Sequence, residues 1–492
     1  MLTAAVNTEL YRYEIHSLIK AFYPEEDVKV LIEGEPIRGA GRAEAAAAAP
    51  FMTVCFDPAF IKVALPGTEY VLEEKAAGEP FDRKGRECKT VLKHMVYDIL
   101  SAYTGRTLPW GELIGIRPTK IAMQRLLEGE SREEAAAFMI REHKASQEKA
   151  LLAADIAERE KKILSGIHYE KGYSLYVGIP FCPTTCLYCS FTSFPIGAWK
   201  TRVDQYLEAL EREILAGSRL MEGKILDTVY IGGGTPTTLE PDQLDRLISS
   251  LKAHFPMENI QEFTVEAGRP DSITPDKLRV LKDHGVSRIS VNPQTMRDET
   301  LKLIGRRHSV AQTEEAFRMA REAGFDNINM DIILGLPGEN KEDVAYTIER
   351  IKALDPDSLT VHSLAVKRAS RLQQWIEKNG FSSINNTDEA MAVAARGAAD
   401  MDMKPYYLYR QKNMSGNFEN VGYAREGKYG IYNILIMEEK QSILALGAGS
   451  ISKAVFAGGR IERSDNCKDI ETYIGTIDEM IARKERLYRQ TG

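Results

Sequence analysis

The chain has 492 residues, of which 43% are hydrophobic and 27% charged, which excludes a disordered or collagen-like protein. Its net charge of −7 argues against a nucleic-acid-binding surface, and no run approaches the ~20 apolar residues of a membrane-spanning helix. Acidic residues near the N-terminus do not fit a secretory signal, so we expect a folded cytoplasmic protein of roughly two to four structural units.

The six cysteines fall into two groups. A large chain without a signal peptide does not need disulfides, so we expect a reducing compartment. Cys55, Cys88 and Cys467 are scattered and are interpreted as small buried hydrophobic residues. The other three lie within eight residues of one another, at Cys182, Cys186 and Cys189.

The N-terminal part mixes strand and helix patterns. Residues 52–65 are rich in β-branched and aromatic residues, which favours strands. The alanine tract at 43–50 is interpreted as a loop or a loose helical turn. Residues 87–105 and 131–167 have helical spacing or composition. We predict an N-terminal α+β domain over 1–165, with a boundary near 160–172 and no recognisable chemistry.

From residue 173 a strand pattern alternates with a helix pattern. The expected strands are 174–179, 227–232, 262–268, 288–292, 327–334 and 358–364. Alternating units of this kind form a parallel sheet with right-handed crossovers. Six units predict an α/β fold with an open, partial (β/α)6 barrel over 172–370. Chemistry is then expected at the carboxyl ends of the strands.

After about residue 370 the alternation ends. A helical stretch at 388–403 precedes a tyrosine-rich segment at 405–413. Residues 432–437 (YNILIM) are strand-like, and a glycine-rich stretch and a final helix follow. We predict a separate C-terminal cap domain over 371–492.

The clustered cysteines directly follow the first expected strand, in the run YVGIPFCPTTCLYCSF. Thiolates hold iron–sulfur clusters, and three ligands leave one iron of a [4Fe-4S] cluster with an open position. The alternatives are a zinc site or inert cysteines, but zinc normally needs a fourth ligand and none follows at close spacing.

This motif at this place resembles the radical S-adenosylmethionine (SAM) superfamily. The resemblance implies that the open iron binds SAM, which one electron cleaves to methionine and a 5′-deoxyadenosyl radical. It also implies a SAM pocket built at successive strand ends. The residues assigned to that pocket are Gly232, Gly233, Gly234, Thr235, Glu266, Gln294, Arg306 and Asp331.

The roles implied for these residues differ. The GGGTP loop would hold the amino group of SAM, and Glu266 would accept a hydrogen bond from its ammonium or ribose. Gln294 offers an uncharged hydrogen-bonding group, Arg306 would pair with the carboxylate, and Asp331 suits a ribose hydroxyl. Taken singly, the GGGTP loop could be a tight turn or a phosphate-binding loop. Each of the four other residues could, taken singly, be a surface or helix-capping residue.

Over roughly residues 172–455 the chain is most similar to oxygen-independent coproporphyrinogen III dehydrogenases and their haem-chaperone relatives. The long N-terminal domain and the run YRQKNMSGNFENVGYA look most like the dehydrogenase branch of low-GC Gram-positive bacteria. Two positions depart from the dehydrogenases: Phe191 replaces a fourth cysteine, and Gly178 replaces a histidine. The chaperones' His-Asn-x-x-Tyr-Trp element is also absent, because the matching stretch is 432–437.

The resemblance implies hydrogen abstraction from the β-carbon of a propionate, with loss of CO2 and one electron to leave a vinyl group. Two such events convert coproporphyrinogen III to protoporphyrinogen IX. An electron donor such as flavodoxin or ferredoxin is implied as a partner. Tyr176 is the catalytic candidate, stacking on SAM or the tetrapyrrole substrate, or else filling the barrel.

The substrate's carboxylates call for cations. The candidates are Lys367, Arg368, Arg410 and Lys412, unless these form a solvated basic surface. Two other functions stay open. The chain could be a haem-binding chaperone, or it could catalyse a different radical reaction on a tetrapyrrole, such as methyl transfer with ring opening.

Overall fold

The computed structural model describes residues 1–32, 50–76, 86–115, 117–366, 370–380, 386–410 and 418–489. The chain forms two compact units, the first built mainly from Met1–Ala154 and the second from most of the rest. The division falls inside helix α5 (Gln147–Ile163), slightly before the expected boundary at 160–172. Within the described ranges, every helix is too short or too polar to cross a bilayer.

The first unit contains a five-stranded sheet in the order β2-β1-β3-β4-β5. Its strands are β1 (Leu2–Val6), β2 (Val28–Ile32), β3 (Met52–Asp57), β4 (Phe60–Ala64) and β5 (Val71–Lys75). β1 is parallel to both of its neighbours, whereas β3, β4 and β5 run antiparallel. The strands expected within 52–65 are confirmed as the β3–β4 hairpin. The alanine tract at 43–49 lies outside the described residues.

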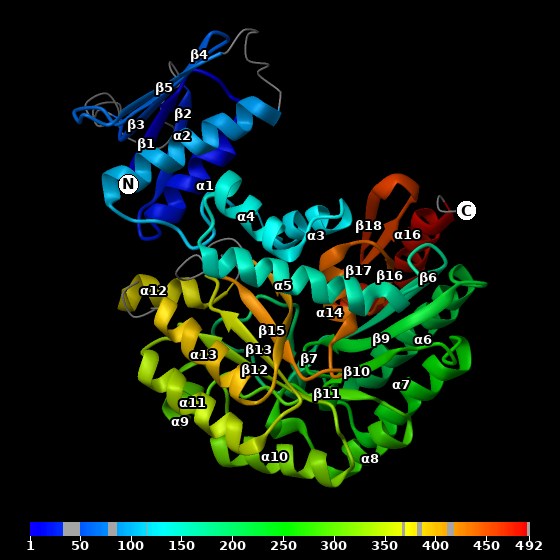
Figure 1. Ribbon diagram of the computed structural model, residues 1–492. Helices are drawn as coiled ribbons and strands as arrows, with labels where there is room; N and C mark the ends of the chain where they lie inside the picture. Colours follow the sequence, from blue (N-terminus) through cyan, green and yellow to red (C-terminus); the bar gives the residue numbers. More distant parts are fainter. Residues whose placement is uncertain are drawn as a thin grey trace. The chain divides into compact units, whose positions relative to one another are not determined.

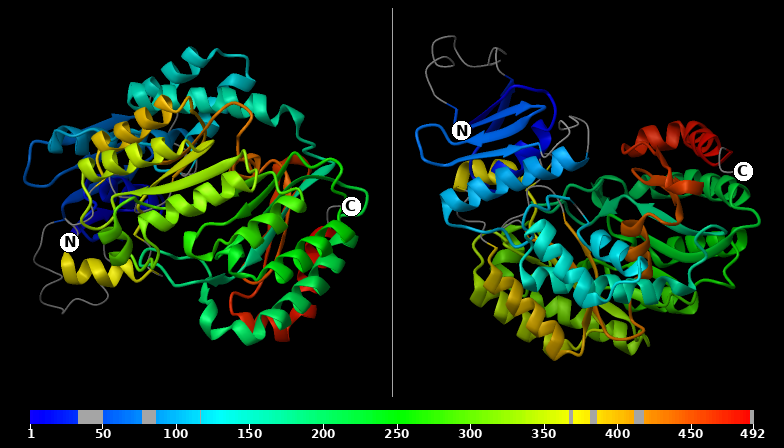
Figure 2. Two further views of the ribbon diagram at one scale, coloured as in Figure 1. Left: turned by 90° about the horizontal axis from the view of Figure 1, so that it is seen from below. Right: turned by 45° about the horizontal axis from the view of Figure 1, so that its top comes forward.

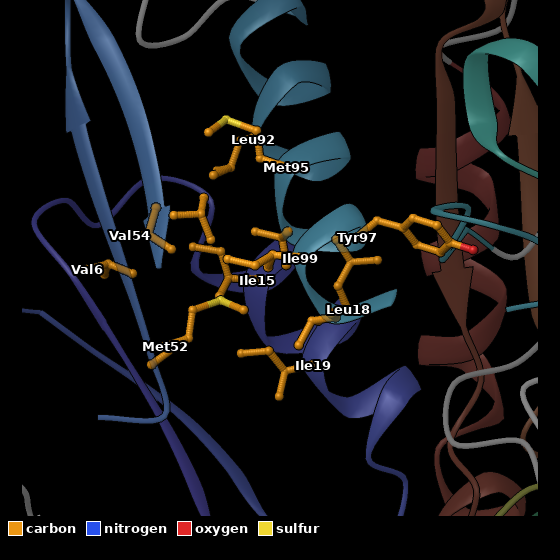
Figure 3. Packing of buried hydrophobic residues seen from close by; sticks show 14 of the residues in the cluster. Val6, Ile15, Leu18, Ile19, Met52, Val54, Leu92, Met95, Tyr97 and Ile99 are labelled. Atoms are coloured by element: carbon orange, nitrogen blue, oxygen red, sulfur yellow. The ribbon is translucent and has the colours of Figure 1, made fainter. Parts of the chain in front are cut away.

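The core of this unit lies between the sheet and two helices, α1 (Arg12–Phe22) and α2 (Arg86–Thr104). Every second residue of β3 is buried, as expected for a strand with one covered face. Figure 3 shows Val6 and Val54 of the sheet facing Ile15 of α1, with Ile99 of α2 beside it. Three further helices follow, α3 (Thr119–Leu127), α4 (Arg132–His143) and α5.

The second unit is organised around an eleven-stranded sheet. Six parallel strands form its centre and lie side by side in chain order. They are β6 (Gly172–Ile179), β9 (Ile225–Gly233), β10 (Glu262–Glu266), β11 (Arg288–Ser290), β12 (Ile328–Leu334) and β13 (Ser358–Ser363). All six expected strands are confirmed, and with them the partial (β/α)6 barrel. They are short and mostly buried because both faces of the sheet are covered.

Helices connect these strands and lie along their outer side (Figure 1). They are α6 (Val203–Leu220), α7 (Pro241–His254), α8 (Pro275–Asp283), α9 (Asp298–Leu303), α10 (Val310–Glu322) and α11 (Lys341–Leu354). Side chains cap several helix starts: Thr274, Ser309 and Asn340 each accept a hydrogen bond from the first turn of α8, α10 and α11.

The C-terminal segment adds strands to both edges of the same sheet. At the β13 edge it adds β15 (Asn420–Ala424) and then β14 (Lys404–Tyr409), both antiparallel to their neighbours. At the other edge β16 (Ser442–Leu446) runs parallel to β6, followed by β17 (Ile451–Val455) and β18 (Ile461–Asp465). In its described residues, the C-terminal segment thus extends the barrel sheet and builds no sheet of its own. The domain limits 1–165, 172–370 and 371–492 stay a prediction.

The remaining helices are α12 (Leu372–Asn379), α13 (Asp388–Asp400), α14 (Ile431–Glu438), α15 (Ile470–Gly475) and α16 (Ile477–Arg489). Helices α13 and α16 match the expected helices. α16 packs beside α6, as the left view of Figure 2 shows. Its Lys484 forms a buried ion pair of 2.6 Å with Glu213 of α6, which ties the end of the chain to the first crossover helix.

The strand expected at 432–437 is wrong, because these residues form helix α14. A short, wholly apolar run fits a buried strand and a buried helix equally well, so its periodicity does not decide between them. In the structure Ile434 and Leu435 pack with Tyr406 and Tyr407 of β14 in a small buried cluster. Packing of this kind, rather than local propensity, selects the helix.

Candidate active site

A cavity of about 780 Å³ lies in the second unit, where the parallel strands end. Eleven of the twelve residues expected to act lie in its wall: Tyr176, Cys182, Cys186, Cys189, Gly233, Gly234, Thr235, Glu266, Gln294, Arg306 and Asp331. The twelfth, Gly232, is not part of the wall but directly precedes Gly233 in the chain. The structure thus brings the expected site residues together, while their individual roles stay predictions.

The loop with the three cysteines is fixed to the strands and loops around it. Its start forms β7 (Phe181–Cys182), which pairs with β8 (Phe194–Pro195). Farther along, the Leu187 amide donates to the Ile304 carbonyl over 2.9 Å, and the Cys189 amide donates to the Cys186 carbonyl over 3.3 Å. These bonds hold the loop in one conformation beside the cavity.

Burial raises the pKa of two of the cysteine thiols, Cys182 and Cys189. It raises the pKa of Cys182 to about 11, although a contact of 3.5 Å to the Thr235 hydroxyl opposes this shift. Burial likewise raises the pKa of Cys189. A thiol of this kind gives up its proton when a metal binds it, which couples metal binding to proton release.

Two arginines lie beside Cys186. Arg306 was expected in the site, but the sequence analysis missed Arg269. The Arg269 guanidinium is held by both oxygens of Asp271, over 2.9 and 2.8 Å, and its Nη1 lies 3.8 Å from Cys186 Sγ. Its position in the sequence could have indicated it, because Arg269 lies three residues after the third strand, at the end where site residues are expected. A fixed positive charge there stabilises a thiolate or an anionic cluster.

The glycine loop after β9 fits closely against the strand that leads to the cysteines. The Gly234 and Thr235 amides donate to the carbonyls of Ile179 and Phe181, each over 2.7 Å. A β carbon at Gly234 would lie 2.5 Å from the Phe181 carbonyl oxygen, so a side chain cannot be accommodated without a shift of the backbone. The glycines therefore allow this close packing beside the cavity.

Buried polar atoms on the cavity wall lack hydrogen-bond partners among the described residues. They are Ser290 Oγ, Asn292 Oδ1, Arg306 Nε and Arg288 Nε. Arg306 also donates from Nη1 to the Asn292 carbonyl over 2.6 Å. Because buried polar groups are normally paired, this set of donors and acceptors indicates a polar ligand.

Gln294 has a left-handed backbone with φ of 70°, which is uncommon for a residue with a side chain. Its amide donates to the Asp331 carbonyl and its carbonyl accepts from the Ile333 amide, each over 2.9 Å. These two bonds attach the loop after β11 to β12. They hold the strained backbone at the cavity wall.

Glu266 lies at the end of β10 beside stacked tyrosine rings. Burial raises its pKa to about 7, while the hydrogen bond from Tyr230 opposes this shift. Tyr230 stacks on Tyr432 of α14 with ring centroids 4.5 Å apart, and Tyr176 lies 6.2 Å from Tyr230. Helix α14, which forms where a strand was expected, thus presents an aromatic ring to the site.

Asp331 has the opposite shift. Burial alone would raise its pKa, but hydrogen bonding and the charge of His362, together with Asn329, lower it overall. Asn329 Nδ2 donates to Asp331 Oδ1 over 2.6 Å, and His362 Nε2 lies 3.7 Å from Oδ2. His362 is a second residue that the sequence analysis missed, although it lies on the sixth expected strand. The cavity therefore combines a carboxyl that readily holds a proton with one that stays ionised.

The cations in the cavity differ from those expected for carboxylate binding. Arg410 is buried and is not part of the cavity wall, and Lys367, Arg368 and Lys412 lie outside the described residues. Among the described residues, the arginines and lysines in the wall besides Arg269 and Arg306 are Arg288, Lys453 and Arg463. The latter two come from the C-terminal strands β17 and β18, which sequence analysis had placed in a separate cap.

The arrangement fits both an iron–sulfur cluster and SAM. No three His, Cys, Asp or Glu side chains in the described part of the chain are placed to hold a single metal ion. A four-iron cluster differs from such a site, because each cysteine ligates a separate iron. Three cysteines on one wall, a tightly packed glycine loop and unpaired buried polar atoms suit a cluster with a polar ligand beside it.

Comparisons with known proteins agree with this geometry. Residues 176–351 match the Radical SAM superfamily. The chain is 40% identical to the "Oxygen-independent coproporphyrinogen-III oxidase-like protein HemZ" of Bacillus subtilis, over 82% of this chain and 83% of the relative. It is 31% identical to the "Heme chaperone HemW" of Bacillus subtilis, over 65% of this chain and 78% of the relative.

A solved structure is also similar. The coproporphyrinogen III oxidase HemN from Escherichia coli, titled a radical SAM enzyme, aligns with a TM-score of 0.51 and 25% identity. The alignment covers 65% of this chain and 73% of the oxidase. Fold, cavity and sequence identity agree: the chain belongs to the radical SAM family of oxygen-independent coproporphyrinogen III oxidase-like proteins.

Proposed function

We propose that this protein is a cytoplasmic radical SAM oxidoreductase that oxidatively decarboxylates two propionates of coproporphyrinogen III to vinyl groups, giving protoporphyrinogen IX. A flavodoxin or ferredoxin would supply the electron that cleaves each SAM, the resulting radical would take one hydrogen atom from the propionate, and a one-electron acceptor would take the electron released with CO2. The observation that carries the proposal is the single cavity in which the cysteine loop, the expected SAM residues, stacked tyrosines and several cations meet. A bound [4Fe-4S] cluster and SAM would supply the one-electron chemistry that side chains lack.

The chain's own residues would bind and orient the reactants. Cys182, Cys186 and Cys189 would hold the cluster. Arg306 would pair with the SAM carboxylate, and Asp331, which stays ionised, would accept from a ribose hydroxyl. The Arg306 charge is buried and the Asp331 charge is partly buried, so each interaction is stronger than it would be in water.

The cavity also suits a flat macrocycle with carboxylate arms. Tyr176, Tyr407 and Tyr409 contribute aromatic surface to the wall. Lys453 and Arg463 both pair with Glu439, over 3.1 and 2.6 Å, so these three groups carry a net charge of +1. This net charge favours an incoming propionate.

A haem chaperone is the second candidate, favoured by one specific observation. Phe191 stands where the dehydrogenases carry a fourth cysteine, and its side chain lines the cavity although it is 71% exposed. An exposed aromatic ring at a cavity wall suits a large apolar ligand. Against this, Tyr432 stands where the chaperones carry histidine, so α14 offers no imidazole to a haem iron at that position.

The test is anaerobic turnover with a reductant, SAM and coproporphyrinogen III. Because each decarboxylation consumes one SAM, we expect about two SAM cleaved per protoporphyrinogen formed. Haem added to the same protein should bind weakly or not at all. Tight one-to-one haem binding, with coproporphyrinogen returned unchanged and the cluster intact, would select the chaperone instead.

A further inference from the structure

A second hollow borders the cysteine loop. It is an open groove of about 950 Å³, walled by residues 183–185 of that loop, by Lys302 and by residues 305–309. Thr184 and Arg306 line both this groove and the active-site cavity. The groove therefore adjoins the cavity in which the cysteines gather.

The groove carries positive charge on a protein that is acidic overall. Lys302, Arg307 and Arg371 are exposed along it, and the structure shows no ion pair for any of them among the described residues. Among the described residues of its wall the one acidic side chain is that of Asp298, which accepts a hydrogen bond from the Val310 amide over 2.8 Å. This local excess of cations has the opposite sign to the net charge of the chain, which is −7.

The floor of the groove is tied to the cysteine loop. The Thr184 hydroxyl donates to the Gly305 carbonyl over 2.9 Å, and the Arg371 guanidinium donates to the Thr185 carbonyl. The loop also bonds to the Ile304 carbonyl through Leu187. A surface held in this way keeps a fixed, short path to the cysteines, which is what electron transfer between proteins requires.

We propose that this groove docks an acidic one-electron carrier protein, which passes an electron through the cysteine loop to the cluster. The inference rests on the proposed function, because only redox chemistry at these cysteines needs a donor. One electron leaves the reduced flavin or iron–sulfur centre of the carrier, and the cluster gains it. Long exposed cations such as Lys302 and Arg307 suit the steering of an acidic protein surface, whereas a small anion is normally held by buried donors.

The test compares two double variants of the reconstituted full-length protein. Lys302→Glu with Arg307→Glu reverses the groove charge. Arg396→Glu with Arg486→Glu makes the same charge change on the outer helices α13 and α16, at exposed residues outside both hollows. The readouts are binding of a flavodoxin, and the rate at which the reduced flavodoxin bleaches the cluster absorption.

At low salt we expect the groove variant to lose at least about tenfold in both readouts, and the control variant to change less than about twofold. The loss should shrink at high salt because ions screen exposed charges. Reduced methyl viologen, a small cationic donor, should bleach the cluster as fast in the groove variant as in the wild type.

Equal effects of the two double variants, or no effect of either, would overturn the proposal. The proposal would also fail if the groove variant lost pyrophosphate binding but kept carrier binding. The groove would then be a site for small anions. The proposed function fails separately: wild-type protein reduced by methyl viologen would then form no protoporphyrinogen, whatever the flavodoxin results.

Discussion

The three cysteines are the only residues of the cavity wall able to supply thiolates to iron, within the part of the chain that the structure describes. We therefore expect Cys186→Ala to abolish the visible absorption of the anaerobically reconstituted cluster, because two thiolates cannot hold a four-iron cluster. Cys55→Ala is the control, since Cys55 lies in the sheet of the first unit. Iron retained at the wild-type ratio in Cys186→Ala would contradict the assignment.

Glu266 makes stability depend on pH. Burial raises its folded pKa from 4.5 to about 7, so the native state binds more protons than the unfolded chain between these values. Stability should therefore fall as pH rises from 4.5 to 7, by up to about 3 kcal/mol from this group.

Glu266→Gln removes that ionisation and keeps an acceptor for Tyr230. Relative to wild type, the variant should gain stability steadily across this window in denaturant unfolding of the protein without SAM. A stability difference that stays constant from pH 4.5 to 8 would show that Glu266 does not titrate there.

Arg463 lies in the cavity wall with half of its side chain exposed. If it contacts a propionate, Arg463→Ala should raise KM for coproporphyrinogen by about fivefold, since a solvent-exposed ion pair contributes roughly 1 kcal/mol. Arg460→Ala is the matched control, because Arg460 pairs with Glu462 and does not line the cavity. The same KM in both variants would remove Arg463 from the substrate site.

At the scale of elements, sequence predicted what periodicity and position determine. Buried parallel strands alternate with amphipathic helices, so β6 and β9 to β13 could be placed from the sequence. Placing these strands also located the candidate site residues at their carboxyl ends. Helix α14 could not be placed, because its apolar run has no decisive period. Lys453 and Arg463 were missed for a related reason: only long-range pairing of β16 with β6 brings β17 and β18 to the cavity.

That pairing depends on the turn after β16. Gly447 has φ of +93°, and a β carbon there would lie 2.3 Å from the Gly178 carbonyl oxygen. Gly427 has a similar φ of +76° but open space around it. We expect Gly447→Ala to destabilise the protein by at least about 2 kcal/mol more than Gly427→Ala, because only the former adds a clash to the backbone strain.

Thermal unfolding and iron content together test this. Gly178 belongs to the strand that leads to Cys182, so Gly447→Ala should also lower the iron bound after reconstitution, whereas Gly427→Ala should not. Equal melting temperatures in the two variants would mean that the turn relaxes without cost.

At the scale of the whole molecule, the two units have different cores. Ile19 of α1 is fully buried between the helices and the sheet of the first unit. Ile214 of α6 is fully buried in the second unit, on the helix that covers the barrel strands. The sequence predicts three domains rather than two units, and the division inside α5 could not be read from composition, because this helix runs through it without a break.

Separate cores predict separate losses of stability. Ile19→Ala and Ile214→Ala each remove buried methyl groups at a cost of about 2–5 kcal/mol. In hydrogen exchange followed by mass spectrometry, we expect Ile19→Ala to speed exchange in β1 and β3, and Ile214→Ala to speed it in β6 and β9. Ile19→Ala should also keep the reconstituted cluster, since every expected cluster ligand lies in the second unit. If either variant instead speeds exchange equally in both sheets, the chain unfolds as one cooperative body and the division at α5 has no energetic meaning.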